Sequence, residues 1–246
     1  MIIDYHCHLP WDREKDIYLI DELLEDTKKN NIRKRVISAI DGYSIKEQND
    51  AVIDTVTKYP DIFIGSALIN PKEKGCIDEL KRVIESKVIK AIELDSLVHN
   101  YYPENEKNLD EIFRIAIENN LVINVFTGWG PRTMPAQWGF YAKKFPEAKV
   151  VLLHMGTTDF GYGCIELVPT LDNLYVETSC LYEFPILRKA FSKIDNSKIL
   201  FGTHYPHKFS KCSIETFDLL NLSEELKEKL YFKNAIDILD LQQEGL

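Results

Sequence analysis

The strongest constraint on the fold of this chain is an alternation of two kinds of segment. Short runs rich in β-branched and other apolar residues span residues 2–6, 35–40, 62–69, 88–94, 121–127, 149–154, 174–178 and 198–202. Stretches that predict helices lie between and after them, at residues 16–31, 44–58, 77–86, 109–119, 135–145, 184–193, 213–222 and 224–239. This alternation is typical of a parallel sheet, because neighbouring parallel strands need a long crossover connection.

Two parallel architectures fit this pattern. Eight strands in a chain of 246 residues predict a closed (β/α)8 barrel of the TIM type, forming a single domain over residues 1–246, since closure leaves no sheet edge exposed. An open, doubly wound sheet is the alternative. It is less favoured because the first strand-to-helix turn, His8-Leu9-Pro10-Trp11, lacks the glycine-rich phosphate loop found in many such folds.

Charge and composition argue against several classes of function. The formal net charge of −9 disfavours a nucleic-acid partner, because phosphate binding needs a basic surface. No apolar run approaches the roughly 18 residues of a membrane span, so no membrane association is expected. The five cysteines are scattered without a Cys-x-x-Cys pair, which disfavours a disulfide framework and indicates the reducing cytoplasm.

The first predicted strand carries two histidines, in the sequence Asp4-Tyr5-His6-Cys7-His8. Because side chains alternate along a strand, we expect Asp4 to share a face with His6 and His8. Tyr5 and Cys7 would then share the opposite face. Two imidazoles at this spacing can converge on a cation such as Zn²⁺. The alternative is a pair of histidines at a solvated strand end.

Further polar residues follow other predicted strands. In a closed α/β barrel the functional residues lie at the carboxyl ends of the strands. Four of the six histidines fall at such ends, namely His6, His8, His154 and His204, and the carboxylates Glu93 and Glu177 do so too. His154 could equally be a core histidine bonded to the backbone, and His204 an exposed loop residue.

Five short motifs occur in order from one end of the chain to the other. They are Ile3-Asp4-Tyr5-His6-Cys7-His8, Val151-Leu152-Leu153-His154-Met155-Gly156, Leu174-Tyr175-Val176-Glu177-Thr178-Ser179, Ile199-Leu200-Phe201-Gly202-Thr203-His204-Tyr205-Pro206 and Asn234-Ala235. Together they resemble the amidohydrolase superfamily, and more narrowly its amidohydrolase-related branch of decarboxylases and lactone hydrolases. The resemblance implies a metal-dependent (β/α)8 barrel. It also implies a divalent metal bound by His6 and His8, with His154 near the metal or orienting the substrate.

Three positions depart from the pattern of that family. His204 stands where the family usually has an acidic metal ligand and proton shuttle, and Phe126 stands where a histidine commonly ends the fifth strand. Glu93 stands where some members carry a lysine. Since a neutral imidazole can bind a metal or act as a general base near neutral pH, His204 could replace the acid. The opposite account is that the site has lost its metal.

The function expected from the sequence is a metal-dependent hydrolase of a small ester, lactone or amide. His6, His8 and His154 are expected to bind Zn²⁺ or Mn²⁺, which would lower the pKa of a bound water, with His204 and Glu93 as catalytic residues. Decarboxylation of a small carboxylated substrate is the nearest alternative, because the same branch contains such enzymes. A metal-free or catalytically degenerate binding protein is the third.

The substrate is expected to contact Trp129, Arg132 and Glu177. Arg132 could pair with a substrate carboxylate, and Trp129 could form part of an aromatic lid. The alternative for Trp129 is packing against the barrel rim. The expected partner is therefore a small molecule, and the chain could also form a homo-oligomer.

Overall fold

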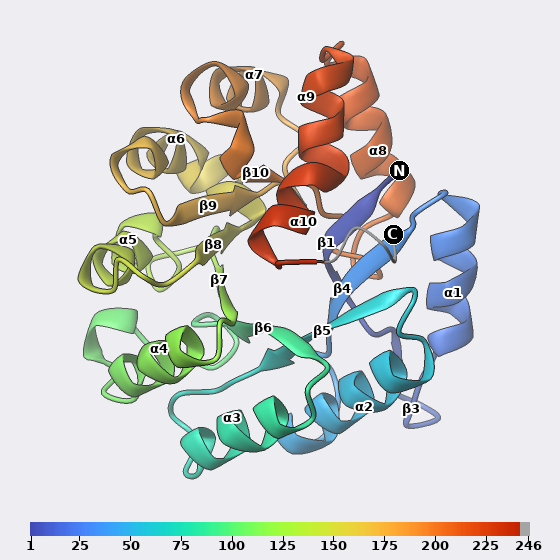
Figure 1. Ribbon diagram of the computed structural model, residues 1–246, viewed down its shortest axis with the longest axis vertical. Coiled ribbons are helices and arrows are strands. Elements are labelled where there is room, and N and C mark those ends of the chain that lie inside the picture. The colour runs from blue at the N-terminus through green and yellow to red at the C-terminus, as the bar shows by residue number, and fades with distance from the viewer. Residues whose placement is uncertain (242–246) are drawn as a thin grey trace.

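The computed structural model describes residues 1–241, and within them eight parallel strands form a nearly closed barrel (Figure 1). In their order around the barrel the strands are β1 (Ile3–His8), β4 (Lys34–Ser38), β5 (Phe63–Leu68), β6 (Ile89–Leu94), β7 (Val122–Phe126), β8 (Val150–Leu153), β9 (Leu174–Glu177) and β10 (Ile199–Leu200). Backbone hydrogen bonds join the last strand to the first, including one of 2.8 Å from the N–H of Tyr5 to the carbonyl of Phe201. The predicted (β/α)8 barrel is confirmed.

Helices cover the outside of the barrel, and the last of them closes one end of it. They are α1 (Ile20–Lys29), α2 (Ile45–Lys58), α3 (Cys76–Glu85), α4 (Leu109–Glu118), α5 (Pro135–Lys144), α6 (Thr157–Leu167), α7 (Phe184–Lys193), α8 (Ser210–Leu219), α9 (Glu224–Glu228) and α10 (Asn234–Ile238). A π-helical turn, Lys229–Lys233, joins the last two, and short 3₁₀ turns span Pro103–Asn105, His154–Gly156, Val168–Thr170 and Asn196–Lys198.

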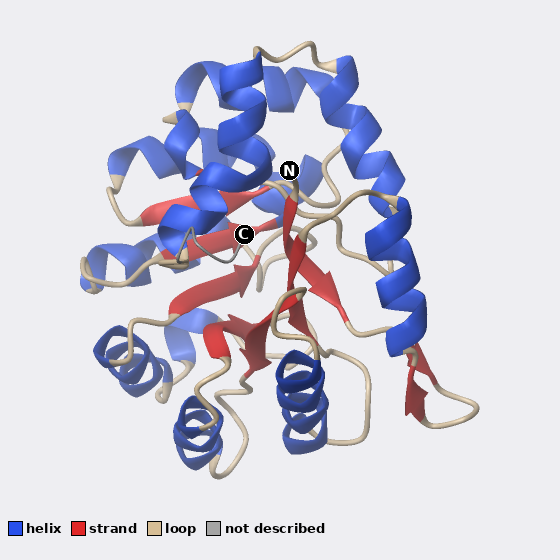
Figure 2. Ribbon diagram, turned by 45° about the vertical axis from the view of Figure 1, so that its right-hand side comes forward, coloured by secondary structure: helices blue, strands red, loops and turns tan. Residues whose placement is uncertain are grey.

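Two segments differ from the sequence prediction. The first helix starts at Ile20, because residues before it form an antiparallel hairpin, β2 (Trp11–Asp12) with β3 (Ile17–Tyr18), which projects from the barrel in Figure 2. The segment before β9, for which no element was predicted, contains the helix α6. Gly161 and Gly163 are weak helix formers, so the helical signal is weak there.

The apolar core has two layers. The larger one lies between the barrel and the surrounding helices. The smaller one fills the barrel interior with the side chains of Ile3, Tyr5, Val36, Ile64, Ala91, Val122, Val151, Leu153 and Leu200. Residues of α10, including Ala235 and Ile236, pack against this interior layer, and Figure 1 shows α10 lying across the centre of the strand ring. The end of the barrel next to α10 is thus filled with apolar side chains. The polar residues gather at the opposite end, where the strands have their carboxyl ends.

An irregularity in β1 changes which of its side chains face the interior. Asp4 is paired with Arg35 of β4, whereas Cys7 is paired with Ile37. Three steps along β1 therefore match two along β4, which places a bulge between Asp4 and Cys7. A bulge leaves one residue unpaired and shifts the alternation of the side chains after it.

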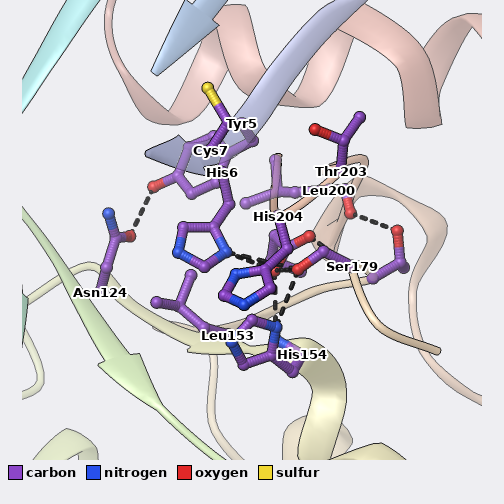
Figure 3. A network of polar contacts seen from close by, with 12 residues as sticks. Tyr5, His6, Cys7, Asn124, Leu153, His154, Ser179, Leu200, Thr203 and His204 are labelled. Atoms are coloured by element: carbon purple, nitrogen blue, oxygen red, sulfur yellow. Dashed lines mark hydrogen bonds and ion pairs between the residues drawn. The ribbon is translucent and has the colours of Figure 1, made fainter. Parts of the chain in front are cut away.

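Because of the bulge, the expected grouping of Asp4 with the histidines is wrong. The Tyr5 hydroxyl donates a hydrogen bond of 2.9 Å across the barrel interior to Asn124 of β7, so Tyr5 faces inward like the adjacent His6 (Figure 3). Asp4 instead forms a buried ion pair of 2.8 Å with Arg35, which also reaches α1 and α8 outside the barrel. Two consecutive residues of β1 thus point into the barrel.

Candidate functional site

Residues from four strands or strand ends meet at the carboxyl end of the barrel. His6 and His8 come from β1, Glu93 from β6, His154 from the end of β8 and His204 from the segment after β10. All five side chains are buried. Figure 3 shows the rings of His6, His154 and His204 turned toward one another. Sequence positions almost 200 residues apart are therefore brought to one point.

The four histidine rings form a compact cluster. Ring centroids lie 4.7 Å apart for His6 and His8, 5.0 Å for His6 and His154, 4.7 Å for His154 and His204, and 5.0 Å for His8 and His204. Two sets of three residues each place one potential ligand atom per residue within 4.8 Å of the others. One set is His6, His8 and Glu93, and the other is His6, His154 and His204.

The polar atoms of this cluster fit a cation. Within the described part of the chain, Nε2 of His6 and Nε2 of His154 are buried and have no hydrogen-bond partner. A buried imidazole nitrogen without a partner is costly, and a metal ion is one of the few groups that can satisfy it. The carboxylate of Glu93 lies beside the His6 ring, with its Oε1 3.7 Å from Nε2 of His6.

The electrostatics of the site favour positive charge. Burial lowers the pKa of His6, but the adjacent carboxylates of Glu177 and Glu93 outweigh it and raise this pKa to about 10. Burial raises the pKa of Glu93, but His8, His6 and a hydrogen bond from Ser38 lower it to about 2. Glu93 is therefore ionised at neutral pH, and the donor set fits a divalent cation.

Ser38 connects two members of the cluster. Its Oγ lies 2.8 Å from Nδ1 of His8 and donates a hydrogen bond of 2.7 Å to Oε2 of Glu93. Nε2 of His8 then faces Nδ1 of His204 at 3.3 Å. Sequence reasoning missed Ser38. The available signal was a hydroxyl that follows Val36 and Ile37 at the carboxyl end of β4.

Glu177 lies behind the histidines. Its side chain is fully buried and accepts hydrogen bonds from the backbone N–H groups of His154 and Ser179 and from the Ser179 hydroxyl. Its Oε2 is also 3.4 Å from Nδ1 of His6. The carboxylate oxygens are thus engaged by the chain itself, a different environment from the substrate-facing one expected from the sequence.

The backbone around His154 is unusual. Residues 154–157 all have positive φ angles, and so does His204. The hydroxyl of Thr127 holds this turn by donating to the carbonyl of Leu153 and accepting from the N–H of Gly156. Non-glycine residues with positive φ are strained, and such strain is common at functional sites.

Aromatic side chains flank one side of the cluster. The ring of Phe126 lies 5.0 Å from that of His154, and the ring of Trp129 lies 5.9 Å from His154 and 5.6 Å from Phe126. Trp129 is 42% exposed, so this aromatic wall reaches solvent. Arg132, further along the same loop, is half-buried with its guanidinium 5.5 Å from the centre of the Tyr102 ring.

His207 also lies next to the cluster, although the sequence analysis did not assign it to the site. Its ring is 5.0 Å from that of His204 and 5.6 Å from that of His8, and its Nε2 is 3.8 Å from Asp41. It is about one-third exposed, at 38%, and therefore borders the open end of the site.

The fold and the site define the class of protein. A parallel α/β barrel with a buried cluster of histidines and a carboxylate at the carboxyl ends of its strands has the architecture of an enzyme. The family model described as amidohydrolase matches residues 3–241, so the chain belongs to the amidohydrolase family. No helix within residues 1–241 is long and apolar enough to cross a membrane. The chain matches none of the curated proteins.

Solved structures of enzymes share the fold. A 5-carboxyvanillate decarboxylase from Sphingomonas paucimobilis is 14% identical with a TM-score of 0.73, and the match covers 98% of this chain and 99% of that one. A dihydroxybenzoic acid decarboxylase from Polaromonas sp. JS666, with bound manganese and 2-nitroresorcinol, is 16% identical with a TM-score of 0.76, over 100% and 98%. A 4-oxalomesaconate hydratase from Rhodopseudomonas palustris is 19% identical with a TM-score of 0.76, over 98% and 96%.

Proposed function

We propose that this chain is a divalent-metal-dependent decarboxylase of a small, planar, carboxylated substrate. The observation that carries the proposal is the aromatic wall of Phe126 and Trp129 beside the ring of His154 at the buried cluster. Decarboxylation needs no attacking water, and a carboxylate that is removed from water loses CO₂ more readily. The solved decarboxylases of the same fold support this choice over hydrolysis.

We propose that His6, His8 and Glu93 hold the metal. Glu93 supplies the negative charge that a divalent ion prefers, and His154, which forms a second set with His6 and His204, is proposed to adjoin the metal. The mixed set of imidazole and carboxylate suits Mn²⁺ as well as Zn²⁺, and structures of the same fold contain manganese. When bound, the metal supplies positive charge that stabilises an anionic oxygen of the substrate.

In this proposal the remaining residues bind the substrate and move a proton. Phe126 and Trp129 stack against the planar part of the substrate and exclude water from its carboxylate. The bond to the carboxylate breaks, CO₂ leaves, and the electron pair stays on the substrate carbon. His204, with His154 beside it, donates the proton that this carbon takes up. Arg132, on the same loop as Trp129, is proposed to pair with a substrate carboxylate.

Burial lowers the pKa of both His154 and His204, and the charges of neighbouring histidines lower each of them further. An anionic substrate would act in the opposite direction, because a negative charge nearby stabilises an imidazolium. Substrate binding would therefore bring the donated proton to the site.

Hydrolysis of an ester, lactone or amide is the second candidate. The observation that favours it is the ionised, buried Glu93 beside His6, because such a carboxylate can accept a proton from water. A cytoplasmic location is also proposed, because the five scattered cysteines form no pattern typical of a disulfide framework. A homo-oligomer stays a prediction.

The test starts with the metal content of protein purified without chelators or a His-tag. The protein is then loaded with Mn²⁺ or Zn²⁺ and incubated with hydroxybenzoates and other carboxylated aromatic compounds, and separately with lactones, esters and amides. A decarboxylase releases CO₂ and, in D₂O, places deuterium on the carbon that lost the carboxylate. Glu93→Gln should abolish this, whereas Glu166→Gln, on the exposed surface of α6, should not. Turnover of the esters or lactones alone would select the second candidate.

Loss of activity in Glu93→Gln with retained metal content would remove Glu93 from the ligand set. If the wild-type protein holds no metal even after loading, both the decarboxylase and the hydrolase proposals are rejected. The remaining hypothesis is then a metal-free binding protein.

A further inference from the structure

The side chain of Ser179 links two histidines of the site to a buried carboxylate. Ser179 follows β9 and is fully buried. Its Oγ lies 2.8 Å from Nδ1 of His154 and 3.3 Å from Nδ1 of His6, and it donates a hydrogen bond of 2.8 Å to Oε2 of Glu177. Figure 3 shows Ser179 between the two rings. The Ser179 hydroxyl therefore contacts the Nδ1 atom of each of the two rings.

The direction of these hydrogen bonds follows from the number of protons. A serine hydroxyl has one proton to donate and two lone pairs that accept. Both oxygens of Glu177 already accept from backbone N–H groups, so in the short contact with Oε2 the hydroxyl of Ser179 donates its proton. The two lone pairs of Ser179 then face the rings. Both His6 and His154 must carry hydrogen on Nδ1 to make these contacts.

The orientation of Glu177 is itself fixed. The backbone N–H of His154 donates to Oε2 at 3.1 Å, and the backbone N–H of Ser179 donates to Oε1. The carboxylate cannot rotate away from Ser179 without losing these bonds. Next to it, the backbone of Gly202 lies where any side chain would meet Oε1 of Glu177. The acceptor for the Ser179 proton is thus held in place from several sides.

We propose that Ser179 is a positioning residue that holds His6 and His154 with the Nδ1 proton of each ring directed at its hydroxyl, so that Nε2 of each ring faces the ligand. The proposal rests on the metal site proposed above. It agrees with the two Nε2 atoms, which are buried and have no hydrogen-bond partner among the described residues. Through Ser179, one carboxylate fixes the ring form of two histidines from different strands, whereas a metal-binding histidine commonly has a partner of its own.

The reverse arrangement is disfavoured by the same distances. If Ser179 donated to Nδ1 of His154, its oxygen would face Oε2 of Glu177 at 2.8 Å with no proton between them. Two acceptors at that distance repel each other, and the penalty is large because the site is buried.

The test compares Ser179→Ala and Ser179→Thr with the wild-type protein. Ser66→Ala is the matched control, because Ser66 is also a buried strand serine, but its contact is with Asn124 in the barrel interior. The form of the His154 ring is read in the metal-free protein from the ¹⁵N chemical shifts of its two nitrogens. Mn²⁺ affinity is read from the electron paramagnetic resonance signal of free Mn²⁺, and circular dichroism confirms folding.

We expect Ser179→Ala to shift His154 away from the Nδ1-protonated form and to weaken Mn²⁺ binding by roughly 10- to 100-fold, the usual effect of losing a partner of a metal ligand. Ser179→Thr keeps the hydroxyl and should restore both properties. Ser66→Ala should change neither. If Ser179→Ala is folded, keeps the wild-type ring form and binds Mn²⁺ as tightly as the wild type, the proposal is overturned while the metal site stands.

The nitrogen shifts separate this proposal from the proposed function. If the wild-type protein binds no Mn²⁺, the proposed metal site is rejected. The protonated nitrogen of His154 in Ser179→Ala then still tests whether Ser179 positions this ring. If Ser179→Thr does not fold, the comparison of Ser179→Ala with Ser66→Ala carries the same decision.

Discussion

Gly202 and Glu177 lie so close together that a Cβ atom on Gly202 would overlap Oε1 of Glu177. The carboxylate behind the histidines therefore occupies the space that a side chain at position 202 would need. Any residue larger than glycine must displace Glu177, whose hydrogen bonds orient Ser179 and the backbone of His154.

Gly202→Ala should lower both the stability of the fold and the metal affinity. Insertion of a methyl group into a packed interior costs roughly 1–3 kcal/mol, and the displaced carboxylate also loses its partners. The free energy of unfolding is measured with urea. Gly163→Ala on α6 is the control, because a Cβ there has open space, and it should leave stability equal or slightly higher. If the two variants have the same free energy of unfolding, the Glu177 side chain can move aside at little cost, and the prediction is wrong.

Metal binding should release a proton from His6 near neutral pH. Glu177 and Glu93 raise the pKa of His6 to about 10, so the free ring is protonated at pH 7, and a ligand nitrogen must lose its proton. The apparent affinity for Mn²⁺ should therefore rise about tenfold per pH unit between pH 6.5 and 8.5. Calorimetry in two buffers of different ionisation enthalpy counts the released protons. An affinity independent of pH would show that His6 is neutral before the metal binds.

The same pKa predicts how the metal-free protein responds to alkali. A histidine whose pKa is raised by folding stabilises the protein fully below its unfolded pKa, about 6.5, and this stabilisation is lost as the pH rises through about 10. The free energy of unfolding of the metal-free protein should fall across that window. His6→Asn should show a smaller fall, and identical slopes for the two proteins would contradict the assignment.

The aromatic wall predicts a change in substrate binding without a change in stability. Trp129 is 42% exposed, so Trp129→Ala should cost little folding energy, yet it removes a stacking surface worth about 0.5–1.5 kcal/mol. KM for a planar aromatic acid should rise roughly 2- to 12-fold. Phe140→Ala, at a more exposed aromatic residue of α5, should leave KM unchanged. A similar KM for both variants would remove Trp129 from the substrate site.

Restoration of the family residues tests whether the site has degenerated. Phe126→His places an imidazole beside His154, and His204→Asp adds the acidic group usual in the family. If the wild-type protein is active, His204→Ala should abolish turnover and leave the circular dichroism spectrum unchanged. Activity that appears only in the double variant Phe126→His/His204→Asp would identify the natural chain as a degenerate member of the family.

The buried ion pair outside the barrel predicts a large loss of stability. Arg35 is fully buried and pairs with Asp4 at 2.8 Å and with Asp26 of α1. Arg35→Met leaves Asp4 buried without its counter-charge, which costs roughly 3–5 kcal/mol. The loss is measured by urea unfolding. Arg114→Met, at an exposed position of α4, is the control and should change stability by less than about 0.5 kcal/mol.

Local pattern was enough to predict the barrel and the position of its active end. Apolar runs separated by helical stretches reflect the period of each element, and this period is written in neighbouring residues. The rule that barrels carry function at strand ends then selected His6, His8, His154 and His204 from one sequence, and the structure brings these four side chains together. The helix α6 was missed because its glycines weaken the local signal.

The arrangement of these residues depends on contacts between distant strands. The bulge in β1 depends on the register of β1 with β4, and register is a property of two strands far apart in the sequence. The same holds for Ser38 beside His8, for Glu93 beside His6, and for Glu177 beneath Gly202. Each is a contact between distant segments, which depends on barrel closure and on side-chain packing. Patterns among neighbouring residues thus indicate which strands carry the four histidines, while packing across the closed barrel determines which of their atoms meet.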